Sequence, residues 1–261
     1  MVGLPVGFKR GLLVSGAITL VVGVAANRRW RTSLGGGLVE MAQGMPMVGA
    51  RLQAILADQL MDGIHKAVAE DITAGFSSGE LLDVGSGPGL LAVEIGRRAR
   101  DLQVTTLESS SDVVQVAEAR IHAAGLGRQL KVARGEPDDI PFPDASFDLV
   151  VSAGALHRWD EPEVVLGEIH RVLRTGGKAW VYDLRREVPE ESWDLVREGV
   201  SPLMRPLFDS TIMAGWSASY NEPKIDLLVA GSPFGQAKVE VLHAEIAGMS
   251  IRSISKVVLQ K

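Results

Sequence analysis

From residue 80 onward, short apolar runs alternate with longer segments whose apolar residues recur every three or four positions. The short runs, which predict buried strands, lie at 80–85, 103–108, 130–135, 147–156 and 178–184. The longer segments, which predict helices, lie at 89–100, 111–125 and 161–173. This alternation indicates a parallel sheet covered by helices on both faces. Ligands of such sheets bind at the carboxyl ends of the strands, where the strand order reverses.

The beginning of the chain has a different pattern. Residues 11–26, GLLVSGAITLVVGVAA, carry no charge and have basic residues on both sides, and Trp30 lies where an interfacial aromatic side chain is expected. As a helix this run is about 24 Å long, against about 30 Å for the hydrocarbon core of a bilayer. We predict a single membrane anchor within residues 1–31. A cleaved secretory signal peptide and a buried core helix are the alternatives.

Between the anchor and the alternating region lies a segment of mixed character, residues 32–78. Its first part is rich in Gly and Met and predicts a connector. Its second part, at 50–73, carries an apolar stripe and predicts an amphipathic helix, in which His65 is not expected to be catalytic. We place the main domain at residues 79–261, after a turn rich in Gly and Ser.

Three glycines at alternate positions, Gly85, Gly87 and Gly89, follow the first predicted strand in LLDVGSGPGLLA. Their missing Cβ atoms allow a tight turn and the close approach of a ligand. The spacing is not the Gly-x-Gly-x-x-Gly of dinucleotide-binding proteins, and the Gly-Lys-Ser/Thr of a phosphate-binding loop is absent from the sequence. Glu108 ends the second predicted strand, where an acidic residue commonly accepts hydrogen bonds from ribose hydroxyls. These features together predict a nucleoside derivative as the ligand.

Four segments together resemble the class I S-adenosylmethionine-dependent methyltransferases, especially the small-molecule branch related to ubiquinone and menaquinone methyltransferases. They are LLDVGSGPGLLA, LESSSDVV, GEPDDIPFPDASFDLVVSAGALHRW and EIHRVLRTGGKAWVYD. The resemblance implies a Rossmann-like, doubly wound α/β fold with seven strands, mostly parallel. Two predicted strands at 236–245 and 250–261 then form an antiparallel hairpin at the C-terminal edge.

The same resemblance implies S-adenosylmethionine as the cofactor. Residues implied to bind it are Asp83, Gly85 and Gly87 beside the methionine portion, Gly89 in the same loop, Glu108 at the ribose and Glu136 at the adenine amino group. Pro137 departs from the family pattern, because proline has no N–H to donate to an adenine ring nitrogen.

The predicted acceptor side of the site contains one candidate for acid–base chemistry. His157, in GALHRWDEP just after the fourth strand, is the candidate general base, and the alternative is that it forms the pocket wall with Trp159. By the resemblance, residues 187–220 contribute a lid and an acceptor pocket. Their bulky apolar side chains suit a hydrophobic acceptor, and ordinary core packing is the alternative.

Composition excludes several other classes of protein. The formal net charge is −5 and the basic residues are not clustered, which argues against a nucleic-acid-binding surface. The chain has no cysteine, so it has no disulfide scaffold, thiol nucleophile or cysteine zinc site. Its five histidines are too scattered for a local metal motif, and no metal is expected.

The predicted function is methyl transfer from S-adenosylmethionine to a small lipophilic acceptor by in-line displacement. Alternatives are a non-catalytic S-adenosylmethionine-binding or scaffold protein at the membrane, an NAD-linked oxidoreductase and a protein methyltransferase. Because S-adenosylmethionine is made in the cytosol, we expect the domain to face the cytoplasm from a single-pass anchor. The cofactor motifs specify neither the acceptor nor the methylated atom.

Overall fold

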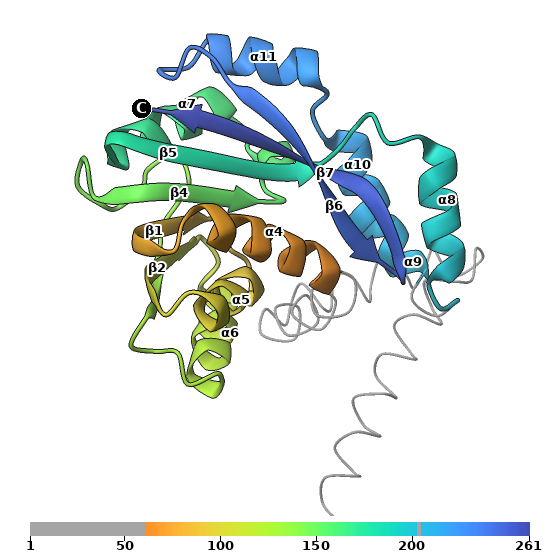
Figure 1. Cartoon of the computed structure of the whole chain (residues 1–261), viewed down its shortest axis with the longest axis horizontal. Coiled ribbons are helices and arrows are strands. Elements are labelled where there is room, and N and C mark those ends of the chain that lie inside the picture. The colour runs from red at the N-terminus through yellow and green to blue at the C-terminus, as the bar shows by residue number, and fades with distance from the viewer. Residues whose placement is uncertain (1–60, 203–204) are drawn as a thin grey trace, which may run out of the picture.

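The computed structural model describes residues 61–202 and 205–261, and its centre is one mixed sheet of seven strands (Figure 1). The strands are β1 (Ser78–Val84), β2 (Asp101–Glu108), β3 (Leu130–Arg134), β4 (Phe147–Ala153), β5 (Leu173–Leu184), β6 (Lys238–Ile246) and β7 (Met249–Gln260). Their order across the sheet is β3-β2-β1-β4-β5-β7-β6. The first five strands are parallel, and β6 and β7 add an antiparallel hairpin at one edge. The predicted Rossmann-like sheet is confirmed.

The helices between the strands begin where the local sequence supplies caps. They are α5 (Leu90–Arg98), α6 (Ser111–Ala123), α7 (Pro162–Val172) and α11 (Glu222–Ala230). Ser110 and Asn221 accept hydrogen bonds from the first turns of α6 and α11, through the backbone N–H groups of Val113 and Lys224. Pro162 occupies the first turn of α7, where its missing N–H removes no helical hydrogen bond. The helices predicted at 89–100, 111–125 and 161–173 are therefore present as α5, α6 and α7.

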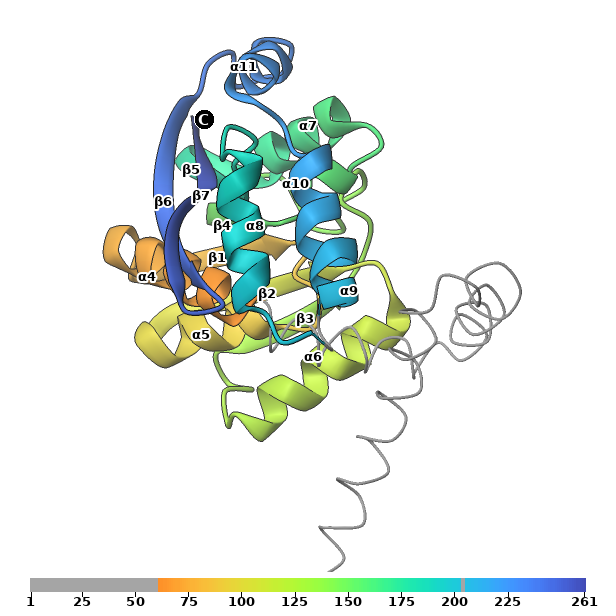
Figure 2. The same cartoon turned by 90° about the vertical axis from the view of Figure 1, so that its right-hand side faces the viewer.

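Helices cover both faces of the sheet. α5 and α6 lie on one face, together with α4 (Asp62–Gly75), and α7 and α11 lie on the other (Figures 1 and 2). Consecutive residues of a strand point to opposite faces of the sheet. Leu81 packs among the side chains of α4 and α5, whereas Leu82 packs with those of α7. Both are fully buried, which explains why the central strands read as continuous apolar runs.

Helix α4 is the first described element, and it is joined to the sheet by a polar cluster as well as by apolar packing. The Tyr182 hydroxyl donates to Asp71 at 2.8 Å, and the Lys256 ammonium lies 2.8 Å from the same carboxylate and 4.0 Å over the ring of Trp180. Burial and the negative charge of Asp71 raise the pKa of Tyr182 far above its usual range, so this hydroxyl remains a donor. The apolar stripe of α4, including Ile72, belongs to the core of the sheet domain.

The segment between β5 and α11 stands at the carboxyl ends of the parallel strands, where the arrowheads of β4 and β5 point in Figure 1. It comprises α8 (Glu190–Gly199), α9 (Arg205–Phe208), a π-helical turn, η2 (Asp209–Met213), and α10 (Ala214–Ala218). Trp193 is fully buried and packs against Phe208 and Trp216, with ring centroids 6.5 and 6.4 Å away. Part of the predicted lid is therefore ordinary core, and a few of its residues between Ser210 and Gly215 line a cavity.

The predicted anchor at 11–26 lies outside the described residues, as do residues 50–60 of the predicted amphipathic helix. Over residues 61–202 and 205–261, no helix combines the length and apolar character needed to cross a bilayer.

Candidate active site

A cavity of about 720 Å³ opens at the carboxyl ends of the parallel strands. It lies at the reversal of strand order, because β1 pairs with β2 on one side and with β4 on the other. Its walls come from the loop after β1, the end of β2, the loop after β3, the end of β5, the π-turn η2, and a short 3-10 turn, η1 (Leu156–Arg158). Segments that are distant in the sequence thus line the same cavity.

The glycines after β1 adopt backbone angles that few other residues tolerate. Gly85, Gly87 and Gly89 have φ of +74°, +57° and +79°, all in the left-handed region. A Cβ on Gly85 would lie 3.0 Å from the Cβ of Ala155, whereas a Cβ on Gly87 would meet no atom within 4 Å. Gly85 and Gly87 line the cavity, and Gly89 caps the start of α5 behind it. The loop leaves room for a ligand at Gly87.

Glu108 stands at the end of β2 and also lines the cavity. One carboxylate oxygen accepts from the N–H of Gly87 and the other from the N–H of Ser110, both at 3.1 Å. These bonds hold the carboxylate in place, and each oxygen keeps a free lone pair for a further hydrogen bond. The arrangement suits a pair of ribose hydroxyls.

Asp83 lies behind the glycine loop and does not line the cavity. It is 1% exposed, and neither of its carboxylate oxygens has a hydrogen-bond partner in the described part of the chain. Burial, and secondarily the negative charge of Glu108, raise the pKa of Asp83 to about 7. A buried acid without a partner is costly to ionise, and a positively charged ligand nearby would favour its ionised form. S-adenosylmethionine, which carries an ammonium and a sulfonium, fits this requirement.

The loop after β3 brings the two predicted adenine-side residues to different places. Pro137 lines the cavity together with Gly135, whereas Glu136 is exposed and is not among the lining residues. The backbone carbonyl of Glu136 accepts from the N–H of Asp139 at 3.3 Å, which closes a tight turn here. Pro137 therefore contributes an apolar surface, and the Glu136 side chain stands outside the cavity wall.

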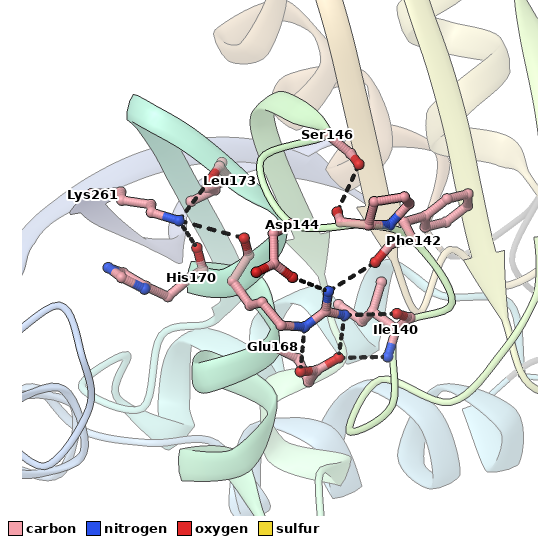
Figure 3. Close-up of polar contacts among 10 residues, drawn as sticks. Ile140, Phe142, Asp144, Ser146, Glu168, His170, Leu173 and Lys261 are labelled. Carbon is pink, nitrogen blue, oxygen red and sulfur yellow. Dashed lines mark hydrogen bonds and ion pairs between the residues drawn. The ribbon is translucent and has the colours of Figure 1, made fainter.

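Helix α7 fixes this loop from outside the cavity (Figure 3). Glu168 accepts from the N–H of Ile140 at 2.9 Å, and Arg171 donates to the carbonyl oxygens of Ile140 and Phe142, both at 2.8 Å. The hydrogen bonds from Arg171 hold the pKa of Glu168 below its usual range, so the pair is charged at neutral pH. Two side chains on one helix thus determine the course of the loop that carries Pro137.

His157 and Asp183 form the polar pair of the opposite wall. The Asp183 carboxylate accepts from the backbone N–H of His157 at 3.0 Å, and both of its oxygens lie 2.9 Å from the His157 Nδ1. Asp183 also accepts from the N–H of Leu184 at 2.8 Å and is nearly buried. These bonds orient the imidazole with Nδ1 bound to the carboxylate, which leaves Nε2 as the nitrogen free to take a proton.

The sequence predicted His157 but not its partner. Asp183 ends a predicted strand, and 26 positions separate it from His157, so no local spacing links the two. The π-turn η2 was missed as well, although Ser210, Thr211 and Ile212 from it line the cavity. The sequence could have predicted that Asp183 lies near His157, because polar residues at the carboxyl ends of parallel strands meet at one edge of a sheet.

Comparisons with known proteins identify a family and relatives that this chain is similar to. Residues 82–181 match the family model described as a methyltransferase domain. The demethylmenaquinone methyltransferase of Porphyromonas gingivalis is 30% identical over 129 residues, which cover 49% of this chain and 53% of that protein. The fatty-acid O-methyltransferase of Mycolicibacterium smegmatis is 33% identical over 114 residues, covering 44% and 40%. The chain thus aligns with about half, or less, of the length of these relatives.

A solved structure supports the fold. A Methanococcus maripaludis protein proposed to be an S-adenosyl-L-methionine-dependent methyltransferase superimposes with a TM-score of 0.63 at 21% identity, covering 82% of this chain and 93% of that one. The sheet order, the glycine loop and Glu108 thus occur in a fold that is similar to that of S-adenosylmethionine-dependent methyltransferases. Residues 82–181 of this chain match the methyltransferase domain model, and the cofactor of that domain is S-adenosylmethionine.

Proposed function

We propose that this chain transfers a methyl group from S-adenosylmethionine to a small lipophilic acceptor whose reacting atom loses its proton to His157. The observation that carries the proposal is the Asp183–His157 pair, which lines the same cavity as the glycine loop and Glu108. A cofactor site and an oriented imidazole in one cavity are the two parts that such a reaction requires.

Each residue then has a defined task. Gly87 gives the cofactor room, and Glu108 accepts from its ribose hydroxyls. Bound S-adenosylmethionine supplies an electrophilic methyl group, whose transfer leaves the neutral sulfur of S-adenosylhomocysteine. His157 takes the acceptor proton at Nε2, and Asp183 fixes the ring and stabilises the imidazolium that results.

The lipophilic character of the acceptor is supported by the wall around His157. Leu184, Ile212 and Trp159 line the cavity with apolar surface on this side. The two relatives named above are a demethylmenaquinone methyltransferase and a fatty-acid O-methyltransferase, and both names denote substrates with long hydrocarbon portions.

The test uses the full chain, methyl-labelled S-adenosylmethionine and a membrane lipid extract. We expect label in the lipid fraction, with His157→Ala and Asp183→Asn lowering the rate by roughly 10²- to 10⁴-fold. His243→Gln, which changes an exposed histidine on β6, is the matched control and should keep the wild-type rate. Label found only in protein contradicts the lipophilic acceptor. Tight cofactor binding without label in any fraction contradicts catalysis.

We further propose that the predicted anchor at 11–26 places the domain at the cytoplasmic face of a bilayer. A lipophilic acceptor dissolved in the membrane supports this proposal, because a tethered enzyme meets such an acceptor at high local concentration. Cell fractionation of the whole chain and of a variant that lacks residues 1–31 tests it. The whole chain should sediment with membranes and the shortened one should not, and equal distribution of the two would refute the tether.

A further inference from the structure

Only one nitrogen of the His157 ring is available to an acceptor, because Asp183 binds Nδ1. One residue beside the other nitrogen is Gly215, in α10 just after the π-turn. A Cβ on Gly215 would lie 3.5 Å from Nε2 and 3.6 Å from Cε1 of His157. The absence of a side chain at this position therefore uncovers the free edge of the imidazole.

The fold itself does not require glycine here. Gly215 is buried within a helix and its φ is outside the left-handed region. The atoms nearest to an added Cβ are at ordinary contact distance, with the Leu184 Cδ1 at 3.4 Å. Alanine fits without displacing a neighbour, and within a helix it is favoured over glycine. Neither backbone conformation nor packing accounts for the missing side chain.

We infer that Gly215 determines acceptor access to His157: the space without a Cβ admits the proton-bearing atom of the acceptor to Nε2. This inference rests on the proposed function and adds a specificity-determining residue to it. A methyl group at 215 covers one side of Nε2, and a larger side chain covers more. The acceptor-side wall, formed by Gly215, Leu184 and Ile212, is then shaped for a group that reaches the imidazole between apolar surfaces.

The first test measures access without any methyl acceptor. Diethyl pyrocarbonate modifies neutral imidazole, and peptide mass spectrometry gives the modification rate of each histidine in the full chain. His157 should react several-fold more slowly in Gly215→Ala than in wild type, and more slowly still in Gly215→Leu. The exposed His243 provides an internal reference that should react equally in all variants. An unchanged His157 rate in Gly215→Ala would overturn the inference.

The second test measures methyl transfer into the lipid extract. Gly215→Ala should lower the rate by about 10²-fold, with cofactor affinity unchanged and a melting temperature no lower than that of wild type. The matched control is Gly167→Ala, since Gly167 lies within α7 and an added Cβ there meets no atom within 4 Å. That variant should gain helix stability without losing activity.

The outcomes of the two tests separate the two proposals. The proposed function is contradicted if the wild-type chain binds the cofactor but transfers label to no fraction. In that case the modification rate of His157 still tests whether Gly215 controls access to the imidazole. A wild-type chain that labels lipid, with Gly215→Ala equally active, contradicts the role of Gly215 and leaves the proposed function standing.

Discussion

Replacing Asp83 with asparagine should change how the stability of the fold depends on pH. Asp83 is fully buried at the end of β1, and the described chain offers its carboxylate no hydrogen-bond partner. Burial raises its pKa from the ordinary value of 3.8 to about 7. Between these two values the unfolded chain has lost this proton while the folded chain retains it. Stability must therefore fall as the pH rises through this window, and the contribution of Asp83 levels off above pH 7.

The size of the effect follows from the two pKa values. Each pKa unit corresponds to 1.36 kcal/mol, so the whole window from pH 3.8 to about 7 is worth on the order of 4 kcal/mol. The part that falls between pH 5 and pH 8 is about 3 kcal/mol. Asparagine has nearly the same shape and cannot ionise, so Asp83→Asn removes this dependence. The variant should gain stability over wild type as the pH rises.

Urea denaturation at pH 5 and at pH 8, without cofactor, measures the free energy of unfolding of both proteins. The difference between Asp83→Asn and wild type should grow by about 3 kcal/mol in favour of the variant from the lower pH to the higher. Asp226→Asn, which changes an exposed carboxylate on α11, is the control and should show no such growth. A difference that stays constant between the two pH values would refute the argument that Asp83 is protonated in the folded chain.

Three further predictions concern the walls of the cavity. Gly87→Ala places a side chain in the cofactor space at φ +57°, a backbone conformation that costs roughly 1–2 kcal/mol for a residue with a Cβ. Calorimetry should show at least about tenfold weaker binding of S-adenosylmethionine. Unchanged affinity would contradict the assignment of Gly87 to the cofactor site. Arg171→Ala removes the bonds that hold the loop after β3 and should lower the free energy of unfolding by about 2 kcal/mol; Arg171→Lys should restore little of it, because lysine lacks the planar fork. Arg197→Ala breaks a two-bond contact with Asp209 at 2.6 and 2.8 Å. Both partners are about 40% exposed, so the free energy of unfolding should fall by less than about 1 kcal/mol. The KM for the acceptor should rise. A rise in the KM for S-adenosylmethionine instead would contradict the placement of the π-turn on the acceptor side of the cavity.

The elements of the sheet domain were predictable because each one satisfies a local rule. Asn221 caps α11 through its own side chain, and Pro162 starts α7, so short stretches of sequence determine where these helices begin. The central strand β1 is largely apolar because both faces of the sheet are covered, which makes Leu81 and Leu82 equally buried. β5 begins at Leu173, five residues before the predicted start at Lys178, because the polar stretch that precedes the apolar run also joins the sheet.

Long-range contacts were not predictable in the same way. The π-turn η2 lies within residues 187–220, for which the sequence predicted a lid and an acceptor pocket, and no residue in DSTIM is special to a π-helical turn. The exposed position of Glu136 depends on how α7 holds the loop, through Glu168 and Arg171 some thirty residues away. The resemblance to a family supplied a role for Glu136, whereas its side chain lies outside the cavity wall.

The two halves of the cavity differ in how the sequence encodes them, and this difference has a mechanistic consequence. The cofactor half uses backbone: Gly87 needs a left-handed conformation, and Glu108 is fixed by the backbone N–H groups of Gly87 and Ser110. The acceptor half uses side chains, or their absence, at His157, Asp183 and Gly215, which meet only in the folded chain. A change in the first half must alter cofactor binding for every acceptor, because all acceptors share the donor. A change at Gly215 or in the π-turn can alter the choice of acceptor while cofactor affinity stays constant. Under the proposed function, exchanging the segment after β5 between relatives should therefore change the choice of acceptor, while His157 and Asp183 remain in place.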